Sequence, residues 1–450
     1  MRTHDLIIIG SGSGNSLLGP EHDDLDVAIV ERGRFGGTCL NVGCIPSKML
    51  VYAAELADLA RNAGPRLGIH TRVDGVDWPG IRDRIFGRID HIAEGGRQYR
   101  EDLPNVTVYP HDARFVGPRT VQVGNDTITA DQIVIAAGGR PQVPSIPGLT
   151  DNDLHTSDTI MRMDALPSRL AIIGGGFIAA ELGSVFGGLG ADVTFVVRSH
   201  RMLTGEDLTI SEAFTASYQQ RHQVRLATSV TRAERNGDDI VLHLSTGDSI
   251  TVDAVLAATG RIPNTDQLDL AQHGYQLDHA GYLVTDENLA TSIEGVWALG
   301  DITNPVQLKH VANHEARVVR HNLSHPNDLR AVNHQFIPHA VFGHPQVASV
   351  GLTETQAEQQ GLAFSTVVQP FAAAAYGWAM EDTSSLCKLV MDTTTRRLLG
   401  AHIIGPQAST LIQQLIQGMA FGQTVDELAS GQYYIHPALP EVVEQALLEL

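Results

Sequence analysis

Two cysteines, Cys39 and Cys44, lie five positions apart near the start of the chain. In a regular helix this spacing separates the two Cα atoms by about 7.5 Å, beyond the roughly 7 Å limit for a disulfide. The backbone between them must therefore be distorted, and Gly43 permits that. A bridge across so short a loop would stabilise the fold little, so we favour a redox role over a structural pair or half of a zinc site. Lys48 and a helix start could supply the positive surroundings that a reactive thiolate needs.

A histidine and a glutamate near the C-terminus could supply acid-base chemistry. The run His436-Pro-Ala-Leu-Pro-Glu441 places a carboxylate five positions after an imidazole. Imidazole titrates in the range needed to protonate a leaving thiol, and a carboxylate can hold the ring in one tautomer. A His-Pro segment alone is usually a loop, so this prediction depends on the two cysteines.

The elements that must position these groups begin with a strand, a glycine turn, a helix and a second strand. Apolar residues 6–9 precede Gly10-Ser-Gly12-Ser-Gly14-Asn15, and a helical stretch and the apolar residues 27–30 lead to Glu31. In the dinucleotide fingerprint the glycines admit a pyrophosphate at the helix N-terminus, and the acid binds a ribose hydroxyl. We therefore expect a nucleotide site in preference to an ordinary glycine turn, although Asn15 replaces the third glycine and Gly19-Pro20 shortens the helix.

The same pattern returns in the middle of the chain. Residues 170–173 are apolar, Gly174-Gly-Gly176-Phe177 follow, and a helix leads to a second apolar run at 192–197. No acid ends this run, and Arg198 and Arg201 come next. Because arginine forks match phosphate oxygens, the pattern favours NADP(H) over two solvated surface arginines.

Three further apolar runs end in glycine turns, at Gly138, at Gly260 and at Gly300-Asp301. The first two flank the second fingerprint, which indicates an inserted domain. Alternating segments after about residue 331, with an apolar helix from about Thr410 to Phe421, indicate an α+β domain. We predict a first nucleotide domain at 1–142 and 265–330, a second at 143–264 and a third domain at 331–450.

Composition narrows the class of protein. The chain has 450 residues and a formal charge of −20, which disfavours nucleic acid and anionic membranes as partners. No apolar run approaches the roughly 18 residues of a membrane helix, and no signal peptide precedes the first strand. Three cysteines suit a reducing compartment, so we expect a cytoplasmic protein in which Cys387 is a buried structural thiol. Only three of the 31 basic residues are lysine, so each lysine is of interest: Lys48, Lys309 and Lys388.

Two nucleotide fingerprints, with a Cys-x4-Cys run in the first, resemble the flavoprotein disulfide reductases, the family of glutathione reductase and lipoamide dehydrogenase. The resemblance covers essentially the whole chain. It implies an α/β fold with two Rossmann-like, three-layer ββα nucleotide-binding domains and an α+β dimerisation domain. It also implies FAD on the first fingerprint and NADPH on the second. The cofactor-binding residues it implies are Gly10, Gly12, Gly14, Glu31, Gly37, Thr38, Gly138, Asp301 at the ribityl chain, His310, Gly174, Gly176, Phe177, Arg198, Arg201 and Gly260.

The resemblance also implies roles for the reactive residues. Cys44 faces the flavin as the charge-transfer thiol, and Cys39 attacks the substrate disulfide. Lys48 lies near flavin N5 and pairs with Glu181, and Phe177 covers the flavin until nicotinamide arrives. His436, oriented by Glu441, acts in the other subunit's active site, so an obligate C2 homodimer is expected. His310 and His314 have a metal-compatible spacing but lack a third ligand, so we expect no metal and place them on the helix beside the flavin.

The expected substrate is a disulfide of low charge. The chain ends nine residues after Glu441 without a further cysteine, which disfavours mercuric reductases and the large thioredoxin reductases. No Lys or Arg occurs between Arg2 and Arg32 to meet the carboxylates of glutathione disulfide. The runs at 10–15, 310–317, 376–383 and 436–441 resemble members that reduce mycothione, the disulfide of a cysteinyl glucosaminyl inositol. The alternatives are a lipoamide dehydrogenase-like enzyme, a glutathione reductase-like enzyme, and a flavin-bound scaffold or sensor.

Overall fold

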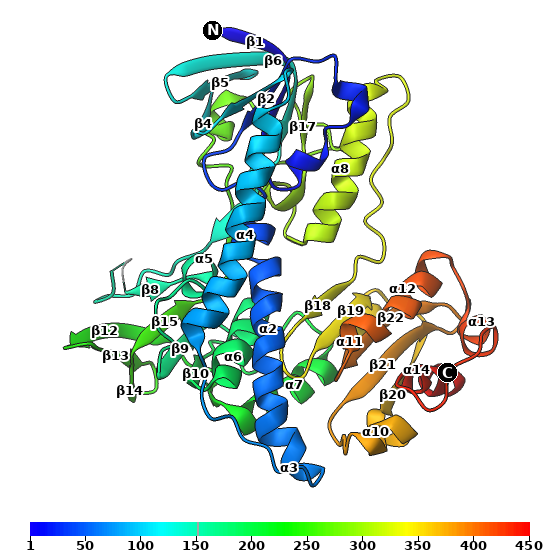
Figure 1. Cartoon of the computed structure of the whole chain (residues 1–450). Coiled ribbons are helices and arrows are strands. Elements are labelled where there is room, and N and C mark those ends of the chain that lie inside the picture. Colours follow the sequence, from blue (N-terminus) through cyan, green and yellow to red (C-terminus); the bar gives the residue numbers. More distant parts are fainter. Residues whose placement is uncertain (151–152) are drawn as a thin grey trace. The chain divides into compact units, whose positions relative to one another are not determined.

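The computed structural model describes residues 1–150 and 153–450 and divides into two compact units. Unit 1 comprises Met1–Pro46, Arg82–Gln142 and Gly260–His334, and unit 2 comprises Ser47–Ile81, Val143–Thr259 and Gln335–Leu450. Figure 1 shows the course of the chain through both units. Across the described residues, no helix is long and apolar enough to cross a membrane. The three-domain boundaries given above stay a prediction.

Unit 1 is built on a seven-stranded sheet whose central strands are parallel. The order is β3-β2-β1-β6-β5-β4, with β17 also paired to β6. Side chains alternate across β1, so Leu6 and Ile8 pack with α8 (Lys309–Ser324) on one face, while Ile7 and Ile9 join a separate core on the other. The strands are β1 (Arg2–Ile9), β2 (Val27–Val30), β3 (Val106–Tyr109), β4 (Ala113–Gly117), β5 (Thr120–Val123), β6 (Asp126–Ile135) and β17 (Val296–Ala298).

The helices of unit 1, or partly in it, carry most of the predicted flavin-side residues. These elements are α1 (Gly37–Asn41), α2 (Cys44–Asp58), α4 (Trp78–Glu101), α8 (Lys309–Ser324) and the short 3₁₀ helices η1 (Gly14–Ser16), η2 (Pro20–His22), η4 (Leu270–His273) and η5 (Gly300–Ile302). The sequence predicted a helical stretch after the first glycine turn, and this was wrong: η1 and η2 occupy that segment. Glycine, serine and asparagine favour turns over helix interiors, and Pro20 begins the second short helix.

Unit 2 contains a parallel sheet of the nucleotide-binding type, in the order β11-β10-β9-β15-β8. A three-stranded antiparallel sheet, β12-β13-β14, packs its apolar side chains against it. The strands are β8 (Leu154–His155), β9 (Arg169–Ile173), β10 (Asp192–Val196), β11 (Gln223–Arg225), β12 (Val230–Asn236), β13 (Asp239–Leu244), β14 (Ser249–Val252) and β15 (Ala254–Ala257). The helices here are α3 (Gly64–Arg66), α5 (Ser157–Ile160), α6 (Phe177–Leu189) and α7 (Leu208–Arg221), with a π-helical turn, η3, at Leu59–Ala63.

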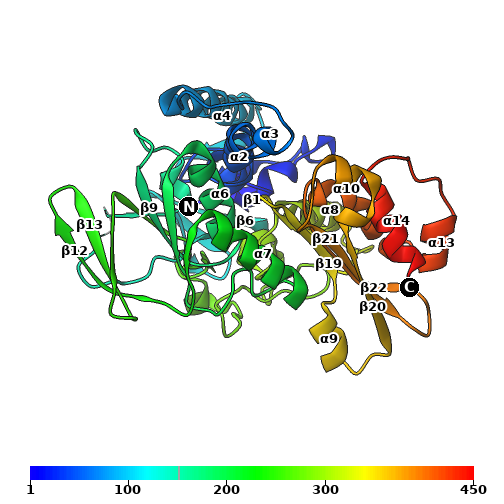
Figure 2. The ribbon, with the colours of Figure 1, turned by 90° about the horizontal axis from the view of Figure 1, so that it is seen from below.

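The C-terminal part of unit 2 is an antiparallel sheet in the order β18-β19-β22-β21-β20. Helix α14 packs on β20 and β21, and α7 reaches β22 (Figure 2). Cys387 is fully buried in β21, as predicted, and burial raises the pKa of its thiol to about 12. The strands are β18 (His339–Val341), β19 (Val347–Gly351), β20 (Phe364–Pro370), β21 (Leu386–Asp392) and β22 (Leu398–Ile404), and the helices are α9 (Glu354–Gln359), α10 (Ala375–Ala379), α11 (Ala408–Leu411), α12 (Gln413–Ala420), α13 (Val425–Ser430), α14 (Pro440–Leu448) and the 3₁₀ turn η6 (Phe371–Ala373). The single helix predicted over 410–421 is divided at Ile412 into α11 and α12.

Candidate active site

The first glycine turn packs directly against the start of the helix that carries Cys39. Gly10 has φ 102°, and a Cβ there would collide with the carbonyl oxygen of Ala136. Gly37 has φ 64°, and a Cβ there would lie 2.7 Å from the Cα of Gly12. A Cβ on Gly14 would lie 2.9 Å from Ile8 Cγ2. The glycines therefore allow the turn to pack closely against Ala136, against Ile8 of β1 and against the start of α1.

Glu31 is held at the end of β2 with its carboxylate directed to the same turn. One carboxylate oxygen accepts hydrogen bonds from Ser11 N at 2.9 Å and Ser11 Oγ at 2.7 Å. The other accepts from Gly33 N at 2.8 Å. An acid fixed beside a glycine turn fits the ribose of a dinucleotide such as FAD.

Asn15, which departs from the fingerprint, binds an arginine from a distant helix. Arg100 of α4 donates from Nε to Asn15 Oδ1 at 2.8 Å and from an Nη to Asn15 O at 2.7 Å. Farther along, Arg320 of α8 donates to Glu21. The segment between Arg2 and Arg32 thus contains no Lys or Arg of its own but is contacted by two arginines from other parts of the chain. Both of these arginines are already bound to groups of the segment.

The two cysteines lie on either side of a break between α1 and α2. The break falls at Val42 and Gly43, and a Cβ on Gly43 would lie 3.0 Å from Thr38 O and 3.4 Å from Cys39 Cα. Both cysteines are half-buried and reduced, and their thiols share a hydrogen bond. That hydrogen bond with Cys44, together with burial, raises the pKa of the Cys39 thiol, whereas the charge of Lys309 lowers it. The predicted distortion at Gly43 is therefore present, and the pair is close enough for thiol-disulfide chemistry.

Lys309 is a residue of this region to which the sequence assigned no role. Its Nζ donates to Ser13 Oγ at 3.0 Å, within the glycine turn that touches α1. Lys48 and Lys388 are ion-paired, whereas no ion pair joins Lys309 to a carboxylate of residues 1–150 or 153–450. Lysine is rare in this sequence, and that rarity drew attention to Lys309 without showing where it lies.

Lys48 and Glu181 contact each other within unit 2. Lys48 Nζ lies 2.6 Å from Glu181 Oε2, and Glu181 Oε1 accepts a hydrogen bond from Phe342 N at 3.0 Å. Lys48 Nζ also lies 4.6 Å from the centre of the Phe342 ring, a cation-π distance. The glutamate is buried and the lysine half-buried. Phe342, just after β18, thus contacts both members of this pair, and the sequence did not single it out.

The second glycine turn, in unit 2, leads into a helix of 13 residues, α6. Gly174 has φ 133°, and a Cβ there would collide with Ala258 O. Gly176 is the N-cap of α6, and the position that a Cβ would take there is open space. Phe177, the first helical residue, is 47% exposed. An open helix N-terminus behind a glycine turn fits the pyrophosphate of a dinucleotide.

Arg198 and Arg201 follow β10, beside this turn in the parallel sheet. Arg198 is exposed, and Arg201 is half-buried. The Nε of Arg201 is buried and has no hydrogen-bond partner among the described residues. Since a buried guanidinium donor without a partner is costly, an anionic ligand such as a 2′-phosphate fits this position.

The predicted glycines at 138 and 260 are brought together in unit 1. Strands β7 (Gly139–Pro141) and β16 (Arg261–Pro263) pair antiparallel. Asn264 N donates to Gly138 O at 3.1 Å, and Gln142 N donates to Gly260 O at 2.9 Å. These two glycines therefore flank one small sheet.

Asp301 lies in η5 at the end of β17. Burial raises the pKa of Asp301, although Arg261 acts in the opposite direction. The preceding Gly300 N donates to the buried Glu315 of α8 at 2.7 Å. A half-buried carboxylate of this kind fits a partner that donates hydroxyl hydrogen bonds, as a ribityl chain does.

The two histidines of α8 differ in their surroundings. His310 in the first turn is exposed, whereas His314 Nε2 is buried and has no partner among the described residues. The described residues contain no group of three side chains that could hold a metal ion.

His436 and Glu441 form a hydrogen-bonded pair in unit 2. His436 Nδ1 lies 2.7 Å from Glu441 Oε1, and Glu441 Oε2 accepts from Ala438 N at 3.1 Å. The hydrogen bond from His436, aided by Ala438 N, lowers the pKa of Glu441. The imidazole is 72% exposed, so its remaining nitrogen can reach a group outside this chain.

Comparisons with known proteins agree with this arrangement. The pyridine nucleotide-disulphide oxidoreductase family matches residues 4–316, and the dimerisation domain of the same family matches residues 337–447. Mycothione reductase of Mycobacterium tuberculosis is 49% identical over 463 aligned residues, covering 100% of both chains. Mercuric reductase of Staphylococcus aureus is 35% identical, over 94% of this chain and 78% of its own. The solved structure of the HOCl-induced flavoprotein disulfide reductase RclA from Escherichia coli superposes with a TM-score of 0.87, at 28% identity and 99% coverage of both chains.

A glycine turn thus lies at each of two parallel sheets, and a cysteine pair lies beside the first turn. The chain belongs to the pyridine nucleotide-disulphide oxidoreductases. The predicted glutathione reductase-like α/β fold with a dimerisation domain is confirmed. Membership of this family implies an enzyme that uses a flavin and a pyridine nucleotide to act on a disulfide.

Proposed function

We propose that the protein is an NADPH-dependent, FAD-containing reductase that converts mycothione to mycothiol in the cytoplasm. The observation that supports a disulfide substrate is the hydrogen-bonded Cys39–Cys44 pair at the break between α1 and α2. The 49% identity to mycothione reductase over the full length supports mycothione in particular.

In this proposal the nucleotide-binding residues have separate tasks. Gly10, Gly12, Gly14 and Gly37 give FAD close access to the backbone, Glu31 binds its ribose, and Asp301 binds its ribityl chain. Gly174 and Gly176 receive the NADPH pyrophosphate, while Arg198 and Arg201 bind its 2′-phosphate. Thr38, Gly138, Gly260 and His310 line the flavin, and Phe177 covers it. The corresponding domains are 1–142 with 265–330 for FAD, 143–264 for NADPH and 331–450 for dimerisation.

The thiol chemistry follows from the pair and from the histidine. The Cys39 thiolate attacks one sulfur of the substrate disulfide, and the other sulfur leaves as a thiol after receiving a proton from His436 of the second subunit. Cys44 then attacks Cys39, its proton passes by way of His436 to the departing sulfur, and the second substrate thiol leaves behind a Cys39–Cys44 disulfide. Bound flavin and NADPH supply the two electrons that restore the dithiol. Lys48, paired with Glu181, contributes a fixed positive charge near the flavin.

Glutathione disulfide is the less favourable substrate because its carboxylates would need cationic partners. Arg100 and Arg320 reach the segment after the first turn, but Asn15 and Glu21 already bind them. Desolvating unpaired carboxylates costs several kcal/mol each, and each 1.4 kcal/mol is about tenfold in kcat/KM.

Steady-state rates with three disulfides and two nucleotides test the proposal. With NADPH, we expect a kcat/KM for mycothione at least ~10³-fold above that for glutathione disulfide. An enzyme that reduces glutathione disulfide equally well, or lipoamide better than either, contradicts the substrate. Faster turnover with NADH contradicts the assigned nucleotide, and a released flavin other than FAD contradicts that cofactor.

A further inference from the structure

The loop after β10 carries Arg198 and Arg201 and ends at Asp207, the N-cap of α7. Near its middle, Leu203 N donates to Gly175 O at 2.7 Å, so the loop is attached to the second glycine turn. Ser211 Oγ of α7 donates to Met202 O at 2.6 Å. Leu203 has φ 50°, a left-handed conformation that is unfavourable for leucine. Such a loop needs anchors to keep one shape.

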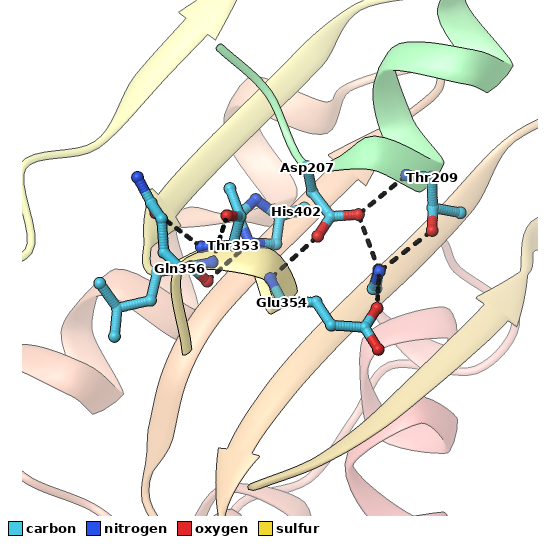
Figure 3. A network of polar contacts seen from close by, with 8 residues as sticks. Asp207, Thr209, Thr353, Glu354, Gln356 and His402 are labelled. Atoms are coloured by element: carbon cyan, nitrogen blue, oxygen red, sulfur yellow. Dashed lines mark hydrogen bonds and ion pairs between the residues drawn. The ribbon is translucent and has the colours of Figure 1, made fainter. Parts of the chain in front are cut away.

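A buried ion cluster forms the anchor at the far end of the loop (Figure 3). Asp207 Oδ1 accepts hydrogen bonds from Lys388 Nζ at 2.8 Å and from Thr209 N at 3.0 Å, and Oδ2 accepts from Glu354 N at 3.1 Å. Lys388 Nζ also donates to Thr209 Oγ1 at 3.0 Å and to the Glu354 carboxylate. Both Lys388 and Asp207 are at most 2% exposed. Burial alone would raise the pKa of Asp207, but the bonds from Lys388 and Glu354 N hold it below its usual value.

The neighbouring residue, Glu206, is attached to the same antiparallel sheet by a second set of contacts. His339 Nε2 of β18 lies 2.7 Å from Glu206 Oε1, and Ser349 Oγ of β19 donates to Glu206 Oε2 at 2.6 Å. Strands β18, β19 and β21 therefore bind consecutive side chains at the end of the loop.

Stability alone is a weak explanation for this arrangement. A buried ion pair is often no more stabilising than apolar side chains of the same volume, because both charges lose their hydration. What it does provide is one defined geometry with directional contacts. Precise placement is what a loop with two phosphate-binding arginines requires.

We propose that Lys388, with Ser349 and His339, positions the loop so that Arg198 and Arg201 meet the 2′-phosphate of the nucleotide. The antiparallel sheet β18-β19-β22-β21-β20, called here the dimerisation-type sheet, thereby contributes to the choice of NADPH over NADH without touching either nucleotide. This inference rests on the proposed use of NADPH. It makes Lys388 a positioning residue whose removal weakens binding of the 2′-phosphate and leaves the adenosine contacts in place.

Binding of 2′,5′-ADP and 5′-AMP to the FAD-loaded enzyme, measured by calorimetry, tests the inference. In Lys388→Met we expect the Kd of 2′,5′-ADP to rise about tenfold, as for one lost charge-assisted contact, while that of 5′-AMP stays within about twofold. The KM for NADPH should rise with an unchanged kcat at saturation. Ser349→Ala keeps the buried charges paired and should raise the Kd of 2′,5′-ADP about threefold. This variant provides the test if Lys388→Met does not fold.

Arg396→Gln is the matched control. Arg396 lies between β21 and β22 of the same sheet, and this substitution removes its exposed ion pair with Asp426. It should leave both ligands unaffected. Equal loss of both ligands in Lys388→Met and Ser349→Ala would show a merely structural role, and no loss in either would also overturn the inference. If the unmodified enzyme binds both ligands equally, the proposed NADPH specificity fails and the inference fails with it. If it discriminates and the variants discriminate equally well, the inference alone is overturned.

Discussion

Cys39 and Cys44 have the same side chain but different surroundings. Cys44 is the first residue of α2, whereas Cys39 lies within the short helix α1. The hydrogen bond with Cys44 and burial raise the pKa of the Cys39 thiol, whereas the charge of Lys309 lowers it. In the proposed function we assign Cys44 to the flavin and Cys39 to the substrate disulfide.

Replacing each cysteine in turn tests this difference. In Cys39→Ser, the remaining Cys44 thiolate should give a long-wavelength charge-transfer band with oxidised flavin. In Cys44→Ser that band should be absent, because the remaining thiol is the one assigned to substrate. Absorption spectra recorded from about pH 6 to about pH 9, a range that includes the ordinary thiol pKa of about 8.5, provide the measurement. A band in Cys44→Ser alone would reverse the assignment.

Lys309 offers a second test at the scale of single residues. Its positive charge lowers the pKa of Cys39, so Lys309→Met should make the dithiol less acidic. We expect the pH midpoint for alkylation of the reduced enzyme by iodoacetamide to rise by about half to one unit. Arg317→Met removes an exposed cation from the same helix and should leave the midpoint in place. An equal shift in both variants would indicate a general effect of net charge.

At the scale of elements, the sequence was most informative where backbone geometry alone requires a residue type. Gly10, Gly37 and Gly174 occupy positions at which a side chain would collide with the neighbouring backbone. The turns could therefore be recognised from glycine spacing between apolar runs. The helix expected after the first turn could not be excluded, because Asn15 is held by Arg100, 85 residues away.

Contacts between distant segments were equally inaccessible to sequence patterns. The Lys388 cluster joins residues 181 positions apart, and no local spacing encodes it. Phe342 beside Lys48 is a similar case. In contrast, His436 and Glu441 are five positions apart within one turn and helix start, so their pairing could be proposed from the chain itself.

The His436–Glu441 turn gives a prediction at this scale. His436→Ala should slow disulfide turnover by about 10²-fold or more, while NADPH still reduces the flavin at the normal rate. Rapid-mixing spectroscopy separates the two half-reactions. If His436→Ala slowed flavin reduction and disulfide reduction equally, His436 would not act solely as the acid-base group of the thiol half-reaction.

Glu441 adds a dependence on pH. Its pKa is lowered in the folded chain, so the contact with His436 is fully present above about pH 4.5 and is lost as the pH falls through the lowered value. The stability difference between the natural protein and Glu441→Gln should therefore be constant near neutrality and shrink in acid. Denaturant titrations at pH 7 and at pH 3 would measure it. If the stability difference between the natural protein and Glu441→Gln grew in acid, the pKa of Glu441 would be raised, and not lowered, by folding.

At the scale of the whole molecule, each unit holds a different part of the chemistry. Unit 1 contains the cysteine pair and Lys309, and unit 2 contains Lys48, Glu181 and the second glycine turn. Unit 2 also contains the dimerisation-type sheet. Strand β22 of this sheet contacts α7, the helix that follows the loop carrying Arg198 and Arg201. If the positioning role proposed above holds, substitutions at this sheet will alter nucleotide use as well as assembly.

The exposed imidazole of His436 has a genetic consequence in the proposed homodimer. One allele with Cys39→Ser and another with His436→Ala each encode a defective enzyme, yet a mixed dimer contains one site with both groups intact. Coexpression of the two alleles should restore about a quarter of the normal activity, because half of randomly formed dimers are mixed and each has one working site. Verified mixed dimers that remain inactive would show that each chain supplies its own acid-base group.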